Sequence, residues 1–224
     1  MERKGVFTMK VLVVGANGQI GKQLVMLLQA SHVYSVRALV RTEGQLKAFE
    51  QSGVEAVMGN LEETVEQLES VVRDCEAVIF TAGSGGKTGY DKTLLIDLDG
   101  AVKMIEASKN MGIKRFVMVS ALQAHNRKNW NEQLKPYYVA KHYADRILME
   151  SGLTYTIIRP GGLLNEDGTG KVTIGENLER GMIPREDVAK TVIASLQESN
   201  VFNKAFDIVS GETTIAEAVG DYKD

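Results

Sequence analysis

The stretch from Val11 to Leu28 constrains the fold of this 224-residue chain more than any other part of the sequence. It opens with the apolar, β-branched run Val11–Val14, which is typical of a parallel strand buried on both faces. Glycines then follow at a spacing of three residues, at Gly15, Gly18 and Gly21. After them, apolar residues recur with helical spacing, at Ile20, Leu24, Leu27 and Leu28.

A strand, a tight glycine turn and a helix in this order form a site that suits a diphosphate. The glycine turn lets the backbone approach the diphosphate closely, and the start of the helix supplies free N–H groups and a partial positive charge. A side chain at Gly18 would stand where the phosphates should lie, and Gly21 lets the helix pack close to the strand. A glycine-rich turn without a ligand is the plainer alternative. The buried type of strand before the turn and the long amphipathic helix after it favour dinucleotide binding.

Apolar runs and amphipathic stretches alternate along the rest of the chain. We expect further strands at 34–40, 54–58, 77–80, 116–119 and 155–158. Helices are expected between them, at 43–51, 62–72, 91–111 and 136–151, with Pro136 in the first turn of the last one. The alternation predicts the α/β class, as one doubly wound parallel sheet with helices on both faces.

The C-terminal part is too short to form a second full domain. Residues 163–219 are expected to hold a strand near 171–174, a helix over 185–196 and a strand at 205–209. We interpret them as a small lobe on the substrate side of the sheet, together with an edge strand. Residues 9–219 are therefore predicted to form a single dinucleotide-binding domain, with 1–8 and 220–224 as terminal extensions outside the functional argument.

Composition and charge argue against several classes of partner. The net charge of −3 gives no basic footprint for nucleic acid or for an anionic membrane surface. No apolar run approaches the ~20 residues of a membrane-spanning helix. The one cysteine, Cys75, cannot form an internal disulfide, so we expect a reducing, cytoplasmic location. The histidines have no companions at metal-ligand spacing, so no metal site is expected.

Polar or small residues stand at the carboxyl ends of the predicted strands, where ligands bind in a doubly wound sheet. Arg41 ends the second strand, where an NAD site has an acidic residue for the ribose 2′-hydroxyl. Its guanidinium suits a 2′-phosphate instead, so Arg41 favours NADP over NAD. Asn60 and Leu61 follow the third strand and are expected to flank the adenine. Residues close to the ribose and phosphates are expected after the fourth strand, at Ala82, Gly83 and Ser84.

Tyr137 and Lys141 form the second informative pair, because residues four apart on a helix share one face. An ammonium beside a phenol favours the phenolate, so we expect Lys141 to lower the pKa of Tyr137 from about 10 and make it a proton donor or acceptor. Lys141 is also expected to hold the ribose next to the nicotinamide. Ser120, at the end of the fifth strand, would hydrogen-bond the substrate oxygen. Tyr138 is the alternative phenol, but its partner four residues on is His142, a weaker group for lowering a pKa.

Other polar residues are weaker candidates. His125, Arg127 and Trp130 lie in the polar loop before the tyrosine helix, and such residues are more often solvated than in contact with a substrate. Asp187 opens the C-terminal helix, where a helix cap or an interaction with the helix dipole is its expected role.

These motifs resemble those of the short-chain dehydrogenase/reductase superfamily over nearly the whole chain, from Lys10 to about Ala218. The likeness is carried by Gly15-Ala-Asn-Gly-Gln-Ile-Gly21, Ser120, Tyr137 with Lys141, and Arg159-Pro-Gly. The glycine spacing and the Arg-Pro-Gly turn are similar to those of the extended and atypical branches. These branches hold the NAD-dependent epimerase/dehydratase-like proteins and the NmrA-like NAD(P)-binding proteins, and the resemblance implies their Rossmann fold.

The resemblance also implies which residues surround the cofactor. The pyrophosphate would be enclosed by Gly15, Asn17, Gly18, Gln19, Ile20 and Gly21. The nicotinamide amide would lie beside Pro160, Gly161, Gly162 and Leu163. Two departures matter. The C-terminal part is shorter than in extended members that enclose a nucleotide-sugar, and Asn60 stands where many relatives carry Asp.

The sequence thus predicts an NADP-dependent oxidoreductase, or an epimerase/dehydratase-like enzyme, that acts on a small carbonyl or sugar-like substrate. Hydride transfer would be coupled to a proton relay through Tyr137 and Lys141. A second hypothesis is a non-catalytic redox sensor that binds NADP and reports its state to a partner, although the intact Tyr–Lys pair argues against it. A third is flavin or quinone reduction, in which Tyr137 matters little. The substrate, the direction of reaction and the oligomeric state do not follow from the sequence.

Overall fold

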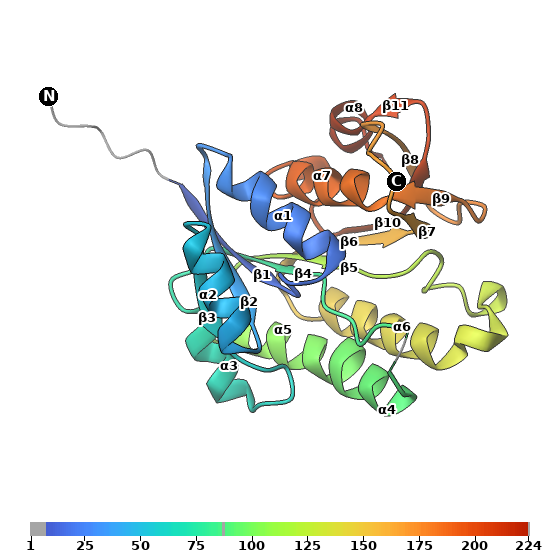
Figure 1. Cartoon of the computed structure of the whole chain (residues 1–224). Helices are drawn as coiled ribbons and strands as arrows, with labels where there is room; N and C mark the ends of the chain where they lie inside the picture. Colours follow the sequence, from blue (N-terminus) through green and yellow to red (C-terminus); the bar gives the residue numbers. More distant parts are fainter. Residues whose placement is uncertain (1–7, 87, 224) are drawn as a thin grey trace, which may run out of the picture.

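The computed structural model describes residues 8–86 and 88–223 (Figure 1). Residues 1–7 and 224, which belong to the two expected terminal extensions, lie outside the described residues. The strands are β1 (Met9–Val14), β2 (Tyr34–Val40), β3 (Glu55–Met58), β4 (Ala77–Phe80), β5 (Arg115–Val119), β6 (Thr154–Pro160), β7 (Gly162–Leu164), β8 (Lys171–Gly175), β9 (Met182–Pro184), β10 (Lys204–Ser210) and β11 (Thr213–Thr214).

The α-helices are α1 (Gln19–Gln29), α2 (Glu43–Gln51), α3 (Val65–Val72), α4 (Tyr90–Lys92), α5 (Gly100–Asn110), α6 (Lys135–Met149), α7 (Arg185–Ser195) and α8 (Ile215–Gly220). A π-helical segment, η1 (Thr93–Asp99), joins α4 to α5. Short 3-10 turns are η2 (Arg127–Asn129), η3 (Glu132–Leu134) and η4 (Ser199–Val201).

Nine strands form one sheet in the order β11–β8–β10–β6–β5–β4–β1–β2–β3. All neighbours from β10 to β3 pair in parallel. Helices α1 and α7 cover one face of the sheet, and α3, α5 and α6 cover the other (Figure 1). The predicted α/β fold with a doubly wound, mainly parallel sheet is therefore confirmed. Within the part of the chain that the structure describes, no helix is long and apolar enough to cross a membrane.

The C-terminal segment belongs largely to the same sheet. β10 lies parallel to β6, while β8 pairs antiparallel with β10 and with β11. A small second sheet pairs β7 with β9, directly after the end of β6. Residues 163–219 thus supply one edge of the main sheet as well as part of the β7–β9 unit. From the expected terminal extension, Tyr222 packs against Phe206 of β10, with ring centroids 5.1 Å apart.

The helix expected at 91–111 is interrupted. α4 covers three residues, η1 follows, and the regular α-helix begins only at Gly100. A π segment holds more residues per turn than an α-helix, so it breaks the stripe of apolar residues on which the prediction depended. Such segments are frequent at functional sites. Here η1 buries Thr93, Ile96 and Asp97, and Asp97 is 1% exposed.

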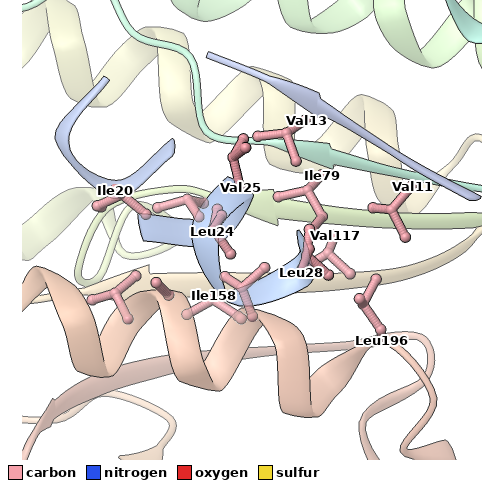
Figure 2. Close-up of a cluster of buried hydrophobic side chains, with 14 of the residues drawn as sticks. Val11, Val13, Ile20, Leu24, Val25, Leu28, Ile79, Val117, Ile158 and Leu196 are labelled. Atoms are coloured by element: carbon pink, nitrogen blue, oxygen red, sulfur yellow. The ribbon is translucent and has the colours of Figure 1, made fainter. Parts of the chain in front are cut away.

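Apolar side chains fill both faces of the central strands. On β1, Val11 and Val13 face α1, whereas Leu12 and Val14 belong to the cluster on the opposite face. Figure 2 shows the first of these clusters, in which the sheet contributes Ile79, Val117 and Ile158 and α1 contributes Ile20, Leu24, Val25 and Leu28. Full burial of one such side chain contributes roughly 1.5–3 kcal/mol. This two-sided burial explains why the central strands are continuous apolar runs in the sequence.

The glycine turn between β1 and α1 is fixed by close backbone contacts. Gly15 has a φ of +89°, and a Cβ built there would lie 2.7 Å from the backbone nitrogen of Ala82. A Cβ at Gly21 would overlap the carbonyl oxygen of Gly15. The N–H of Gly18 donates to that same oxygen at 2.9 Å. The start of α1 therefore lies closer to the turn than a residue with a side chain would allow.

We expect Gly21→Ala to lower the free energy of unfolding by about 1–3 kcal/mol, because the new methyl group overpacks the turn. Gly44→Ala is the matched control, since Gly44 lies in the exposed α2 and a Cβ there meets no atom within 4 Å. In the Gly44→Ala variant, the free energy of unfolding should rise by up to about 1 kcal/mol. Urea unfolding measures both changes. Equal effects of the two substitutions would contradict a steric constraint at the turn.

Candidate functional site

The carboxyl ends of the parallel strands lead into two cavities. The first, which we call the glycine-turn cavity, has a volume of about 210 Å³ and is lined by residues at the ends of β1 to β4. The second, the tyrosine cavity, has a volume of about 410 Å³ and is lined by residues that follow β5 and β6 and by one face of α6. Most of the predicted site residues line one or the other.

The glycine-turn cavity collects predicted residues from all four strand ends. They are Gly15, Asn17, Gly18, Arg41, Leu61, Ala82 and Gly83. α1 begins at this cavity, and the backbone N–H groups of Gln19, Ile20 and Gly21 have no hydrogen-bond partner among the described residues. No acidic side chain lies in the first turn of α1. An anionic group fits here, because free N–H groups and the positive end of the helix dipole stabilise negative charge.

Arg41 contributes a cation to this cavity. Its side chain is exposed, and its guanidinium has no hydrogen-bond or ion-pair partner among the residues that the structure describes. The backbone N–H of Arg41 donates to Gln45 Oε1 at 2.9 Å, so the Gln45 side chain lines the same wall. The guanidinium is therefore available to an anionic part of a ligand.

Other predicted residues lie beside the glycine-turn cavity rather than in its wall. Ile20 packs in the core. The Asn60 Oδ1 accepts from the N–H of Glu62 at 3.1 Å, so this amide closes a local turn. Ser84 donates its N–H to Asp97 Oδ2 at 2.9 Å. The hydrogen bonds of Asn60 and Ser84 therefore stabilise the loops around the cavity.

The tyrosine cavity has mostly apolar walls, formed by Ala121, Leu122, Leu134, Pro160, Leu163 and Met182. Its backbone wall includes Gly161 and Gly162, so the whole predicted segment Pro160–Leu163 lies here. The polar side chains that line it are Ser120, Tyr137, Tyr138 and Arg180. Ser120 is buried, and its Oγ has no hydrogen-bond partner among the described residues. A buried hydroxyl without a partner is costly, so it is available to a polar atom of a ligand.

A buried ion pair lies next to Tyr137. The Lys141 Nζ is 3.4 Å from Asp97 Oδ1, 3.4 Å from the carbonyl oxygen of Val119 and 5.7 Å from the centroid of the Tyr137 ring. The side chains of Lys141 and Asp97 are 5% and 1% exposed. Because Asp97 also accepts from the Ser84 N–H, the pair links η1, α6, the end of β5 and the loop after β4.

Lys141 does lower the pKa of Tyr137, but the expectation that this pKa falls below its ordinary value of about 10 is wrong. Burial raises the pKa of the Tyr137 phenol, and Lys141 offsets this effect only in part, while Asp97 adds to it. Burial of the phenol is the larger cause, and the Asp97 carboxylate beside the ammonium reinforces it. Burial opposes the charge on Lys141, but Tyr137 and Asp97 together raise the pKa of Lys141 above its ordinary value. Tyr137 is therefore a neutral phenol at neutral pH and can donate a proton.

A second buried ion pair stands behind the tyrosine cavity. Arg159 Nε donates to Asp145 Oδ2 at 2.9 Å, and both side chains are buried. Arg159 Nη1 lies 3.0 Å from Nδ1 of His125, which must be the acceptor because a guanidinium only donates. The other ring nitrogen of His125 then donates to Asn177 Oδ1 at 3.0 Å. His125 thus connects two loops and is not a freely solvated residue.

Asp207 of β10 holds the same two loops. Its Oδ1 accepts from the N–H of Gln123 at 2.9 Å, and its Oδ2 accepts from the N–H of Leu178 at 3.2 Å. Asp207 is fully buried, and burial raises its pKa while these two N–H donors act in the opposite direction. The loop after β5 and the loop after β8 both carry walls of the tyrosine cavity, so one carboxylate positions both walls.

Tyr138, the alternative phenol, makes other contacts. Its hydroxyl accepts from Arg180 Nη1 at 3.4 Å, and its ring stacks on Trp130 with centroids 6.0 Å apart. The Nδ1 of His142, its expected partner, lies 3.0 Å from the carbonyl oxygen of Ala124. Burial also lowers the pKa of His142, so its ring carries no charge that would activate Tyr138 at neutral pH. Both phenols thus have a cation nearby, and Tyr137 is the one that lies beside the buried Lys141–Asp97 pair.

Asp97 and Arg180 are site residues that the sequence analysis did not identify. Asp97 interrupts the apolar run 94–98, and an acid in such a run is a signal for a buried carboxylate that needs a partner. Arg180 lies between β8 and β9, where no periodicity places it. Among the described residues, no group of three or more His, Cys, Asp and Glu side chains could hold a metal ion. The thiol of Cys75 is buried and lines neither of the two cavities.

Comparison with known proteins agrees with this geometry. The profile of a family described as NAD(P)H-binding matches residues 15–199. The chain belongs to this NAD(P)H-binding family. It is a Rossmann protein of the atypical, epimerase-like type within the short-chain dehydrogenase/reductases. The predicted binding of a nicotinamide dinucleotide is thereby confirmed at the level of the family.

Individual relatives cover almost the whole chain. The uncharacterized sugar epimerase YhfK of Bacillus subtilis (strain 168) is 65% identical over 211 residues, which are 94% of this chain and 99% of that protein. The sanguinarine reductase of Eschscholzia californica is 28% identical over 256 residues, covering 95% and 93% of the two chains. A solved structure from Bacillus halodurans, named as a candidate NAD-dependent epimerase/dehydratase, is 40% identical, with a TM-score of 0.90 over 96% of this chain and all of that one.

We expect Asp97→Asn to lower the pKa of Tyr137, because Lys141 then acts on the phenol without an opposing carboxylate. The ultraviolet absorbance of tyrosinate measures this pKa when each protein is compared with its Tyr137→Phe counterpart. In the wild type, the Tyr137 signal should appear only above about pH 10. Breaking a buried ion pair costs about 3–5 kcal/mol, so circular dichroism must first show that the variant is folded. A Tyr137 titration that is unchanged in the variant would remove Asp97 from control of the phenol.

Proposed function

We propose that this protein is an NADP-dependent oxidoreductase that reduces a small carbonyl compound. The observation that carries the proposal is that Ser120 and Tyr137 line the same cavity. The buried Lys141–Asp97 pair lies next to them and also borders the glycine-turn cavity. Relatives named as an epimerase and as a reductase support an enzyme over a non-catalytic sensor.

In this proposal, the two cavities would hold different parts of the cofactor. The free N–H groups at the start of α1 would hold the pyrophosphate, and Leu61 would form an apolar wall for the adenine. Lys141 would hold the ribose near the nicotinamide, beside Pro160–Leu163. When bound, the nicotinamide supplies the hydride for the reduction. The chain itself has to orient the carbonyl group and supply the proton.

Tyr137 supplies that proton in our proposal. A carbonyl oxygen that accepts from Ser120 Oγ and from the Tyr137 hydroxyl is polarised by both, and the phenol proton passes to it as negative charge develops. Lys141 stabilises the tyrosinate that results, and Asp97 keeps the ammonium in position. The raised pKa of Tyr137 suits this direction, since it keeps the donor protonated at neutral pH.

The walls of the tyrosine cavity favour a carbonyl compound with an apolar body over a sugar. Leu122, Leu134, Leu163 and Met182 offer no hydrogen bonds, so sugar hydroxyl groups that face these side chains would lose their water without compensation. We therefore favour carbonyl reduction over sugar epimerisation.

We expect Tyr137→Phe to lower kcat for carbonyl reduction about 10²–10⁴-fold while leaving NADPH affinity unchanged. NADPH oxidation over a panel of aldehydes and ketones measures the first, and calorimetry the second. The wild-type rate should be flat through neutral pH. It should fall only above about pH 10, because the activity needs the protonated phenol and its pKa is raised.

Tyr143→Phe is the control for this variant, since Tyr143 lies on α6 but is 39% exposed and lines neither cavity. Tyr138→Phe tests the alternative phenol. Wild-type turnover in Tyr137→Phe would exclude Tyr137 as the proton donor. Tight NADPH binding without oxidation on any compound would instead favour the redox sensor.

Our choice of NADP over NAD rests on Arg41. The cavity beside it has no acidic lining residue that would bind a free 2′-hydroxyl or repel a 2′-phosphate. We expect Arg41→Gln to weaken NADPH binding about tenfold or more and to leave NADH binding nearly unchanged. Calorimetric titration with both nucleotides measures this, with Arg73→Gln at the exposed end of α3 as the charge-matched control. Equal affinity of the wild type for NADPH and NADH would contradict the choice.

A further inference from the structure

We propose that the tyrosine cavity selects carbonyl substrates that also carry an oxyanion, and that Arg180 is the residue that binds this anion. The inference rests on the proposed function, because it names the class of substrate that the same cavity reduces. A carboxylate and a phosphate share the relevant chemistry, and the test below separates them.

Arg180 carries a positive charge that no acidic side chain of this site balances. Two buried cations next to the cavity are each matched with a buried carboxylate, Lys141 with Asp97 at 3.4 Å and Arg159 with Asp145 at 2.9 Å. Arg180 has no ion-pair partner among the described residues, and the lining of the cavity includes no Asp or Glu. The cavity therefore presents a net positive charge to whatever enters it.

The guanidinium of Arg180 is already oriented. Its Nη1 donates to the hydroxyl of Tyr138 at 3.4 Å, and its Nη2 donates to the carbonyl oxygen of Asn129. Tyr138 is itself fixed by its stacking on Trp130. These contacts use two of the five N–H donors of the group, so the others can bind an oxyanion without the entropic cost of ordering the side chain.

The rest of the cavity fits the same substrate class. Ser120 and Tyr137 provide donors for the carbonyl oxygen, and leucine, proline and methionine side chains form the wall between them and Arg180. A substrate with a carbonyl group, an apolar middle and an anionic end would satisfy all three regions. A cationic compound would be repelled by Arg180, and a neutral compound would gain nothing from it.

A direct test compares ligands that differ only in the anionic group. 4-(Hydroxymethyl)benzoate, its methyl ester and 4-(hydroxymethyl)phenyl phosphate are titrated calorimetrically into the NADP⁺-loaded protein. We expect one of the two anions to bind about tenfold or more tightly than the ester. The stronger anion identifies the oxyanion as a carboxylate or a phosphate. Failure of both anions to bind better than the ester overturns the proposal.

Variants assign this preference to one side chain. Arg180→Gln should bring the anions within about twofold of the ester, and Arg180→Lys should keep part of the preference. Lys128→Gln is the control, because it removes the same charge from the neighbouring exposed loop without changing the lining of the cavity. A preference that survives in Arg180→Gln, or that is lost equally in Lys128→Gln, overturns the proposal. Thermal denaturation and NADPH affinity show that each variant is folded.

Kinetics with the corresponding aldehydes separate this proposal from the proposed function. For 4-carboxybenzaldehyde, Arg180→Gln should raise KM about tenfold or more and leave kcat nearly unchanged, because the anion lies away from the reacting carbon. Anion binding that depends on Arg180 without reduction of any aldehyde would retain the anion site and reject the reductase. Equal kcat/KM for 4-carboxybenzaldehyde and its methyl ester would retain the reductase and reject the anion site.

Discussion

The ion pair between Lys141 and Asp97 is the interaction on which the candidate site depends. Taking two such charges out of water costs on the order of several kcal/mol each, so the pair needs further hydrogen bonds to be stable. The carbonyl group of Val119 and the N–H of Ser84 supply them. One interaction therefore fixes four separate segments of the chain relative to one another. It also determines how much of the lysine charge reaches Tyr137, so packing and acid–base chemistry are set together.

The central part of the fold could be predicted because its strands are buried on both faces. Runs such as Val11–Val14 and Ala77–Phe80 are continuously apolar, and this signal needs no knowledge of neighbouring elements. The shortest strands were harder to predict. β7 and β9 have three residues each and β11 has two, which is too short for a period of two to appear. η1 could not be predicted either, because a helical stripe assumes 3.6 residues per turn.

The site could be predicted where one helix or one turn carries its residues. The glycine spacing and the Tyr137–Lys141 spacing are of this kind, and both lie at the cavities that the strand order forms. The spacing was misleading about the phenol, because it places an ammonium near the ring. It says nothing about the burial of that ring or about the carboxylate that η1 brings to the same ammonium. Arg180 was missed for a related reason, since its contacts with Tyr138 and Asn129 exist only after the sheet has formed.

Asp207 separates the parts of the chain that form the two cavities. The ends of the first four strands line the glycine-turn cavity, whereas the loops after β5 and β8, which carry walls of the tyrosine cavity, are both tied to a carboxylate on β10. Substitutions near that carboxylate can thus change which compound the tyrosine cavity accepts without changing the glycine-turn cavity.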